Sequence, residues 1–102
     1  IIVACGSNKT LYKAISSLQK LLPRLAKINS LKKLNNVNLK TMAFTNKLSQ
    51  LMNISNLVAG KAGPNLLFEA VAQEKPFLAI CHISGQEDAN LEIIKKKKLG
   101  FV

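Results

Sequence analysis

Short apolar runs that end in a glycine or a polar turn alternate along the chain with segments of helical spacing. The first run, Ile1–Cys5, is rich in β-branched residues and ends at Gly6, which is typical of a buried strand. Pro23 lies inside the helical segment that follows, so we expect it to kink or split that helix. Apolar residues three and four positions apart form one stripe along this helix. They are Leu11, Ala14, Ile15, Leu18, Leu21, Leu22, Leu25 and Ile28.

The same alternation continues to the end of the chain. Further strands are predicted at 36–44, 55–60, 77–80 and 100–102, and further helices at 46–52, 65–73 and 86–98. The order of elements is therefore β-α-β-α-β-α-β-α-β. Strands this apolar, alternating with amphipathic helices, predict an α/β fold in which a parallel sheet has helices on both faces.

Three glycine-containing loops follow predicted strands: Gly6–Asn8, Gly60–Gly63 and His82–Gln86. Ligands of open parallel sheets bind beyond the carboxyl ends of the strands, so we expect these loops along one edge. A helix that starts near Pro64 and Asn65 would direct its free N–H groups and its dipole at that edge, which favours an anion. Gly63 would let the backbone approach a ligand closely.

The polar side chains near this edge each allow two interpretations. Glu69 lies on the first turns of a largely apolar helix, where it could accept two hydrogen bonds from the vicinal diol of a ribose. It could equally be a solvated helix position. Gln86 and Glu87 open the last predicted helix, where they could bind sugar hydroxyls or only cap the helix. Spacing alone leaves both questions open.

Charge and composition narrow the class of partner. The 102 residues include 15 Lys and Arg against 5 Asp and Glu, a net charge of +10, which favours nucleic acid, an anionic membrane face or a phosphorylated ligand. A compositional bias toward Lys, Asn and Ile accounts for part of this charge. No aromatic residues are interleaved with the basic ones, which weakens the case for single-stranded nucleic acid. Cys5 and Cys81 show no CxxC spacing and are expected to be buried, reduced thiols.

Three segments carry a family pattern. The pattern is K-[AP]-G-[GP]-x-x-x-x-E-A and then, after a strand, P-G-Q-E-x-x-N. It appears here as Lys61-Ala62-Gly63-Pro64, Glu69-Ala70, and Gly85-Gln86-Glu87 with Asn90. This resembles the donor-binding segment of the diacylglycerol glycosyltransferases, which include the plastid monogalactosyldiacylglycerol synthases and the bacterial processive diacylglycerol glucosyltransferases. "VACGSNKTLYKAI" and "AFTNKLSQLMNISNLVAGKAG" resemble two other segments of that family, so the resemblance covers essentially the whole chain.

The resemblance implies a fold and an activity. Such enzymes have two Rossmann-like domains around a cleft, the GT-B arrangement. Residues 1–102 would be the nucleotide-sugar-binding C-terminal domain, as a fragment that lacks its first strand and the N-terminal acceptor domain. The implied reaction is inverting transfer of a hexose from a UDP-hexose to a membrane lipid acceptor such as diacylglycerol, with no metal and no other cofactor. The fragment alone is expected to be inactive.

The resemblance also implies a cytoplasmic enzyme that is peripheral at the cytoplasmic membrane face. Anionic lipids would then attract exposed lysines, and nucleic acid is not an expected partner. A solvated surface is the alternative interpretation of the same lysines. The candidates are Lys32, Lys33, Lys95, Lys96, Lys97 and Lys98.

Roles carried over from the family follow the donor substrate. Glu69 would bind the ribose hydroxyls of UDP, and the backbone near Phe44 would lie against uracil. The diphosphate would face the helix start at Gly63, Pro64 and Asn65. The hexose hydroxyls would bind Gly85, Gln86 and Glu87. Gly6, Asn8 and His82 would line the same donor edge, with His82 contacting sugar or phosphate rather than acting as a base, and no catalytic base is assigned.

Other interpretations stay open at this level. One is another UDP-sugar enzyme of the same fold, such as the lipid-intermediate N-acetylglucosaminyltransferase or an epimerase. Another is a non-catalytic module that binds nucleotides or nucleic acid. Ser7 stands where the family often has Arg, and Asn65-Leu66 stands where it usually has Gly-Thr. These departures affect the expected diphosphate contacts and leave the donor sugar open.

Overall fold

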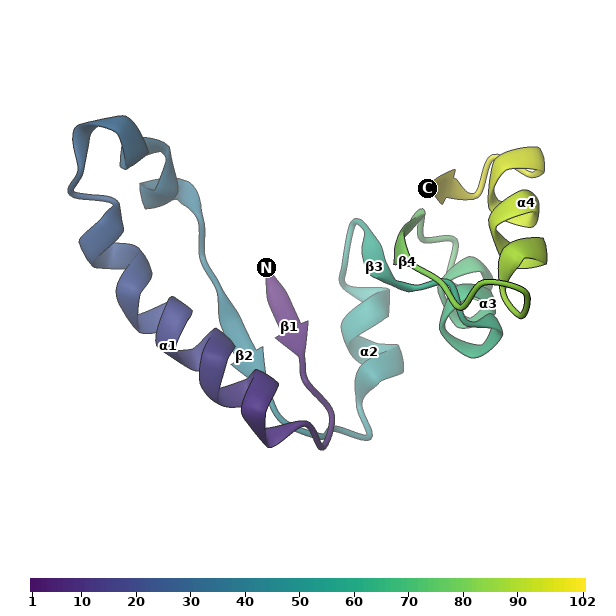
Figure 1. Cartoon of the computed structure of the whole chain (residues 1–102), viewed down its shortest axis with the longest axis horizontal. Helices are drawn as coiled ribbons and strands as arrows, with labels where there is room; N and C mark the ends of the chain where they lie inside the picture. Colours follow the sequence, from purple (N-terminus) through teal and green to yellow (C-terminus); the bar gives the residue numbers. More distant parts are fainter. The chain divides into compact units, whose positions relative to one another are not determined.

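The computed structural model describes residues 1–102, which form two compact units, Ile1–Asn46 (unit 1) and Lys47–Val102 (unit 2). The observed order of strands and helices confirms the predicted α/β class, apart from one additional 3₁₀ helix (Figure 1). The elements are β1 (Ile2–Ala4), α1 (Lys9–Leu25), the 3₁₀ helix η1 (Asn29–Asn36), β2 (Lys40–Met42), α2 (Leu48–Asn53), β3 (Val58–Lys61), α3 (Pro64–Ala72), β4 (Phe77–Cys81), α4 (Asp88–Lys96) and β5 (Gly100–Phe101).

Unit 1 is a pair of parallel strands with one long helix beside it. β1 and β2 pair in register from Ile2 opposite Lys40 onward, and α1 runs along them (Figure 1). Asn8 caps α1, because its Oδ1 accepts a hydrogen bond from the Leu11 N–H at 2.9 Å. Gln19 Oε1 accepts a hydrogen bond from the Thr41 N–H at 3.2 Å, which ties the helix to β2.

Pro23 was expected to kink or split this helix, and the splitting did not occur. α1 is assigned as one continuous helix that contains Pro23 and ends at Leu25. A proline removes only one helical N–H donor, and this one lies in the last turn, where the Ala26 N–H still donates to the Leu22 carbonyl at 3.0 Å. The predicted strand at 36–44 is shorter in the structure, because η1 extends to Asn36.

Unit 2 holds a three-stranded parallel sheet in the order β3-β4-β5. The register places Val58 opposite Phe77, and Leu78 opposite Phe101. Phe77, Leu67 of α3 and Ile94 of α4 are fully buried, so the sheet and the two helices share one core. Its buried residues are Met52, Val58, Leu67, Ala70, Phe77 and Ile94.

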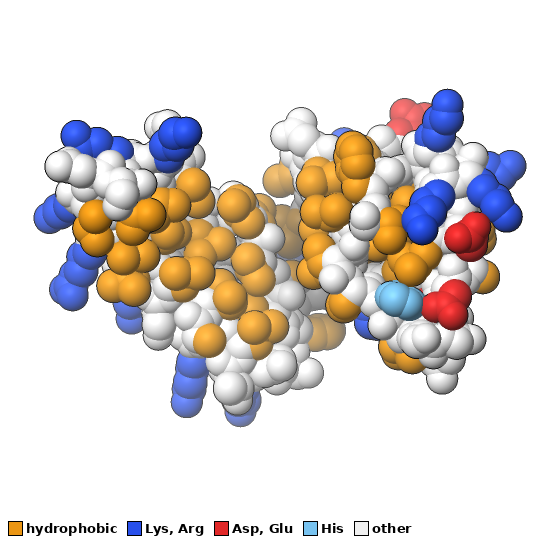
Figure 2. Space-filling model, turned by 45° about the horizontal axis from the view of Figure 1, so that its top comes forward, with side chains coloured by type: hydrophobic (Ala, Val, Ile, Leu, Met, Phe, Trp, Pro, Cys, Tyr) orange, Lys and Arg blue, Asp and Glu red, His pale blue; other side chains and the backbone are white.

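Two features differ from the expected sheet. The strands form two separate sheets, β1-β2 and β3-β4-β5, rather than one. In unit 2 the core lies on one face only, that of Phe77 and Ala79. Side chains alternate along a strand, so Leu78 and Ile80 face the other way, and Ile80 is 66% exposed. Figure 2 shows hydrophobic side chains at the surface of both units.

The cysteines are both free, as predicted, but only Cys5 is buried. Cys81 is exposed because it ends β4, beyond the part of the strand that packs against the helices. Burial at the end of an apolar run was therefore a wrong expectation for Cys81.

Gly100 allows β5 to pair with β4. Its φ is +158°, and a Cβ built there would lie 1.9 Å from the Phe77 carbonyl oxygen. The Phe77 N–H donates to the Leu99 carbonyl at 3.0 Å, so the two backbones meet at this point. A side chain at position 100 would push the strands apart.

We expect Gly100→Ala to destabilise unit 2 by about 2 kcal/mol or more, since the clash is with backbone that cannot rotate away. Thermal unfolding followed by circular dichroism measures this. Gly63→Ala is a matched control: Gly63 has φ −70°, and its Cβ would meet nothing closer than 3.4 Å. An equal loss of stability in both variants would contradict the assigned role of Gly100.

Candidate functional site

The carboxyl ends of β3 and β4 bring two predicted site loops together. Residues 62 and 63 connect β3, which ends at Lys61, to α3, and residues 82–87 follow β4. The two strands are parallel neighbours. The Ala62 N–H donates to the Cys81 carbonyl at 2.9 Å, which joins the loops where the strands end. Of the three loops expected along one edge, the structure shows these two together, and the third, Gly6–Asn8, belongs to unit 1.

An ion pair between a half-exposed lysine and a buried carboxylate connects the loops. Glu87 is 5% exposed and is the one charged residue of the chain that is buried. Its Oε1 accepts a hydrogen bond from Lys61 Nζ at 2.5 Å, and its Oε2 accepts one from the Ile83 N–H at 2.7 Å. The Lys61 ammonium and the Ile83 N–H stabilise the carboxylate and hold the pKa of Glu87 below its ordinary value.

A second hydrogen bond supports the ion pair. Asn90, in the first turns of α4, donates through Nδ2 to the Ala62 carbonyl at 2.7 Å. Ala62 is fully buried, so its carbonyl needs this partner. Lys61, Glu87 and Asn90 belong to the two halves of the sequence pattern, and the structure shows that they fasten those halves to each other.

The loop after β4 is held by an acidic residue that sequence reasoning missed. Asp88 Oδ1 lies 3.1 Å from His82 Nε2, and Asp88 Oδ2 accepts a hydrogen bond from the Gly85 N–H at 3.0 Å. Gly85 has φ +80°, a conformation that favours glycine. Figure 2 shows the histidine beside an acidic side chain at the surface. An acid in the first turn of α4 was the available signal, because such residues bind preceding N–H groups.

The start of α3 offers N–H groups without a capping side chain. Gly63 is the N-cap residue and makes no side-chain cap, and Pro64 is the first helical residue. Asn65 is exposed. The Gly63 N–H donates to the Lys61 carbonyl at 2.8 Å, so Asn65 offers the first N–H without a cap. Anion binding at this helix start stays a prediction.

Glu69 lies further along α3 and is half-buried. Its carboxylate makes no hydrogen bond or ion pair within the chain. One helical turn later, Gln73 donates to Ser49 Oγ of α2 at 3.0 Å, so Glu69 shares the helical face that adjoins α2. Gln86 is exposed, and only its backbone N–H is bonded, to the Ile83 carbonyl at 3.1 Å. Both side chains are therefore available to a ligand.

The remaining predicted site residues belong to unit 1. Gly6 has φ +57° in the turn after β1, and the side chain of Asn8 caps α1. Phe44 is 77% exposed, two residues after β2. The Cys5 N–H donates to the Met42 carbonyl at 2.8 Å, so these residues follow the carboxyl ends of two paired strands within unit 1.

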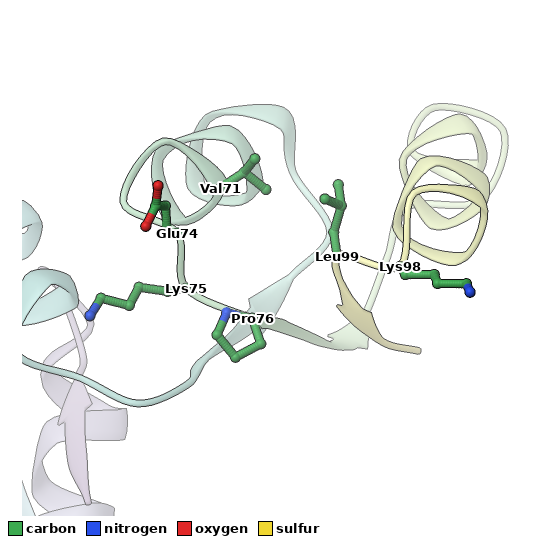
Figure 3. Close-up of a pocket in the computed structure, with 6 residues that line it drawn as sticks. All are labelled: Val71, Glu74, Lys75, Pro76, Lys98 and Leu99. Atoms are coloured by element: carbon green, nitrogen blue, oxygen red, sulfur yellow. The ribbon is translucent and has the colours of Figure 1, made fainter.

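A shallow hollow of about 310 Å³ lies at the opposite end of the unit 2 strands (Figure 3). Val71 and Glu74 come from the end of α3, Pro76 precedes β4, and Leu99 follows α4. None of the predicted site residues lines it. Ligands of parallel sheets bind at the carboxyl ends of strands, so the hollow is no candidate for the donor site.

Metal-ligating groups do not cluster in the structure. No three His, Cys, Asp or Glu side chains lie close enough to share a metal ion. The metal-free chemistry implied by the family resemblance stays a prediction.

Comparison with known proteins confirms the resemblance to diacylglycerol glycosyltransferases. The chain is 26% identical over 100 residues to the probable chloroplastic monogalactosyldiacylglycerol synthase of Nicotiana tabacum and 25% identical over 100 residues to monogalactosyldiacylglycerol synthase 1 of Arabidopsis thaliana, in each case covering 98% of this chain and 16% of the relative. It is 27% identical over 102 residues to the processive diacylglycerol β-glucosyltransferase of Bacillus cereus, covering 100% of this chain and 23% of the relative. No family model matches the chain.

The observed fold agrees with this comparison. Its parallel strands alternate with helices, as in a Rossmann-like part of a glycosyltransferase. The chain spans 16% to 23% of the length of the curated relatives it matches. None of its helices has the length and apolar character needed to cross a membrane.

We expect the Glu87 ion pair to stabilise the fold in a pH-dependent way. A carboxyl group with a lowered folded-state pKa contributes stability above its unfolded value, ordinarily 4.5, and loses it as the pH falls through the lower folded value. Glu87→Gln should therefore lower the melting temperature at pH 7, and the difference from the wild type should shrink in acid below pH 4.5.

Melting temperatures between pH 7 and pH 3 measure this effect. Glu92→Gln is the matched control, because Glu92 lies on the same helix, is exposed, and makes only a 3.8 Å ion pair with Lys96. A Glu87→Gln curve parallel to the wild-type curve at every pH would contradict the expectation.

Proposed function

We propose that this chain is the donor-binding part of a glycosyltransferase that transfers a hexose from a UDP-hexose to a membrane lipid such as diacylglycerol. One observation carries the proposal. The two halves of the sequence pattern lie side by side at one edge of the sheet, joined by the Lys61–Glu87 ion pair and the Asn90–Ala62 hydrogen bond. The relatives that the chain resembles, monogalactosyldiacylglycerol synthases and a diacylglycerol β-glucosyltransferase, support the same reaction class. The acceptor-binding part would lie in a larger protein of the length of those relatives.

The proposed donor pose follows the free groups at that edge. The ribose hydroxyls bind Glu69, whose carboxylate has no partner within the chain. The diphosphate faces the start of α3 at Gly63, Pro64 and Asn65. The Gly63 N–H donates to the Lys61 carbonyl and Pro64 has no N–H, so the Asn65 N–H is the first that could meet the anion, and no side chain caps it. The hexose binds beside the loop that contains Gly85 and Gln86.

The reaction is an inverting displacement. The acceptor hydroxyl forms a bond to the anomeric carbon of the hexose as the bond from that carbon to the UDP oxygen breaks, and the acceptor proton passes to a base outside this chain. Negative charge grows on the departing diphosphate, and the positive end of the α3 dipole stabilises it without a metal ion. His82 is tied to Asp88 and would at most contact sugar or phosphate.

Glu69→Ala should weaken UDP binding by about tenfold or more, since two hydrogen bonds to a charged group are lost. Isothermal titration calorimetry of the complete protein that contains this chain measures it. Glu92→Ala, an exposed carboxylate on α4, is the control and should bind as the wild type does. Unchanged affinity in Glu69→Ala would contradict the ribose assignment, and a wild type that binds no UDP would contradict the donor proposal.

The proposed acceptor places the enzyme at an anionic membrane surface. The complete protein should bind vesicles of anionic lipid better than neutral ones, because exposed lysines such as Lys32, Lys33 and Lys95–Lys98 each contribute about 1 kcal/mol near such a surface. Sedimentation with the two kinds of vesicle, at low and high salt, measures this. Equal binding to both would contradict peripheral membrane attachment through these lysines.

A further inference from the structure

We propose that Glu87 is a positioning residue that fixes the geometry of the donor edge through Lys61, and not a ligand of the hexose. This inference rests on the proposed function and changes the role that family resemblance gives to Glu87. Two observations carry it: both carboxylate oxygens already have protein partners, and the side chain is 7% exposed. With 7% of the side chain exposed, the lone pairs that remain on the two oxygens are poorly accessible to a sugar hydroxyl.

The carboxylate lies beneath the loop rather than on its surface. A Cβ built on Gly63 would be 3.4 Å from Glu87 Oε1 and 3.6 Å from Lys61 Nζ, so the ion pair adjoins the start of α3. Through Ile83 the same carboxylate fixes the loop after β4. One buried group therefore sets the distance between the proposed diphosphate site and the proposed hexose site.

Gln86 precedes the positioning residue and stays exposed. Its backbone is bonded to Ile83, and its side chain has no partner within the chain. Asp88 closes the preceding turn by accepting from the Gly85 N–H. The geometry thus directs one residue of the Gln-Glu pair into the structure and leaves the other for the hexose.

Lys61 has an electrostatic task as well. An unpaired carboxylate beside the α3 start would repel a diphosphate, and the ammonium group neutralises it while remaining 49% exposed. Removal of Lys61 alone should therefore harm donor binding more than removal of both charges. A residue that only filled space would produce no such rescue.

The first test compares UDP with UDP-glucose and UDP-galactose by calorimetry, on the complete protein that contains this chain. Glu87→Gln should weaken UDP and both UDP-hexoses by the same factor, about tenfold. Gln86→Ala should leave UDP affinity unchanged and weaken only the UDP-hexoses. Glu92→Gln, on the same helix, should change neither. Loss of UDP-hexose affinity with unchanged UDP affinity in Glu87→Gln would overturn the proposal.

The second test is a double-mutant cycle on UDP affinity. Lys61→Met should bind UDP more weakly than Lys61→Met combined with Glu87→Gln, because the double variant has no unpaired carboxylate. Additive losses would overturn the proposal. Asn90→Ala removes only the supporting hydrogen bond and serves as a second variant if Lys61→Met does not fold. It should lower the affinity for UDP and for both UDP-hexoses by the same factor. A wild type that binds no UDP would instead refute the proposed function.

Discussion

The arrangement of the donor edge depends on a charge that the fold buries. Removing a carboxylate from water is costly unless a counter-charge and hydrogen bonds replace the lost hydration. Glu87 receives both, from Lys61 and from the Ile83 N–H. Lys61 ends β3, 26 residues before Glu87, and Ile83 lies in the loop after β4, so one buried carboxylate ties the end of β3 to that loop.

The hydrophobic core of unit 2 is too small to fix the loops by itself. Six buried residues form the core of unit 2, and all pack on one face of a three-stranded sheet. Hydrophobic contacts of this extent hold α3 and α4 against the strands, but they are not directional and do not fix the loops beyond the strand ends. The directional bonds of Glu87, Asn90 and Asp88 supply that part of the structure.

Sequence periodicity predicted the elements better than their ends or their contacts. The strands and helices of unit 2 appear where apolar spacing placed them, because each element buries one face against Phe77 or Leu67. η1 escaped prediction, since 29–36 is mostly polar, with Leu31 and Leu34 as its only apolar residues. The predicted split at Pro23 did not occur, because the effect of a proline depends on how many helical turns follow it. The division into two sheets depends on strand pairing, which local patterns do not encode.

Sequence patterns were also limited in predicting the roles of individual site residues. The pattern identified Gln86 and Glu87 as a pair of polar neighbours but could not separate their roles, because the partners of Glu87 are distant in sequence. Neighbouring residues before a helix point in different directions, and here one is buried while the other is exposed. The Glu87 carboxylate has its hydrogen-bond partners inside the fold, whereas the Gln86 amide at the surface has none, so the two side chains suit different tasks. Glutamine can both donate to and accept from a sugar hydroxyl, and it adds no negative charge next to a diphosphate. An enzyme that binds an anionic donor therefore gains by placing the amide at the surface and the carboxylate beneath it, against a lysine.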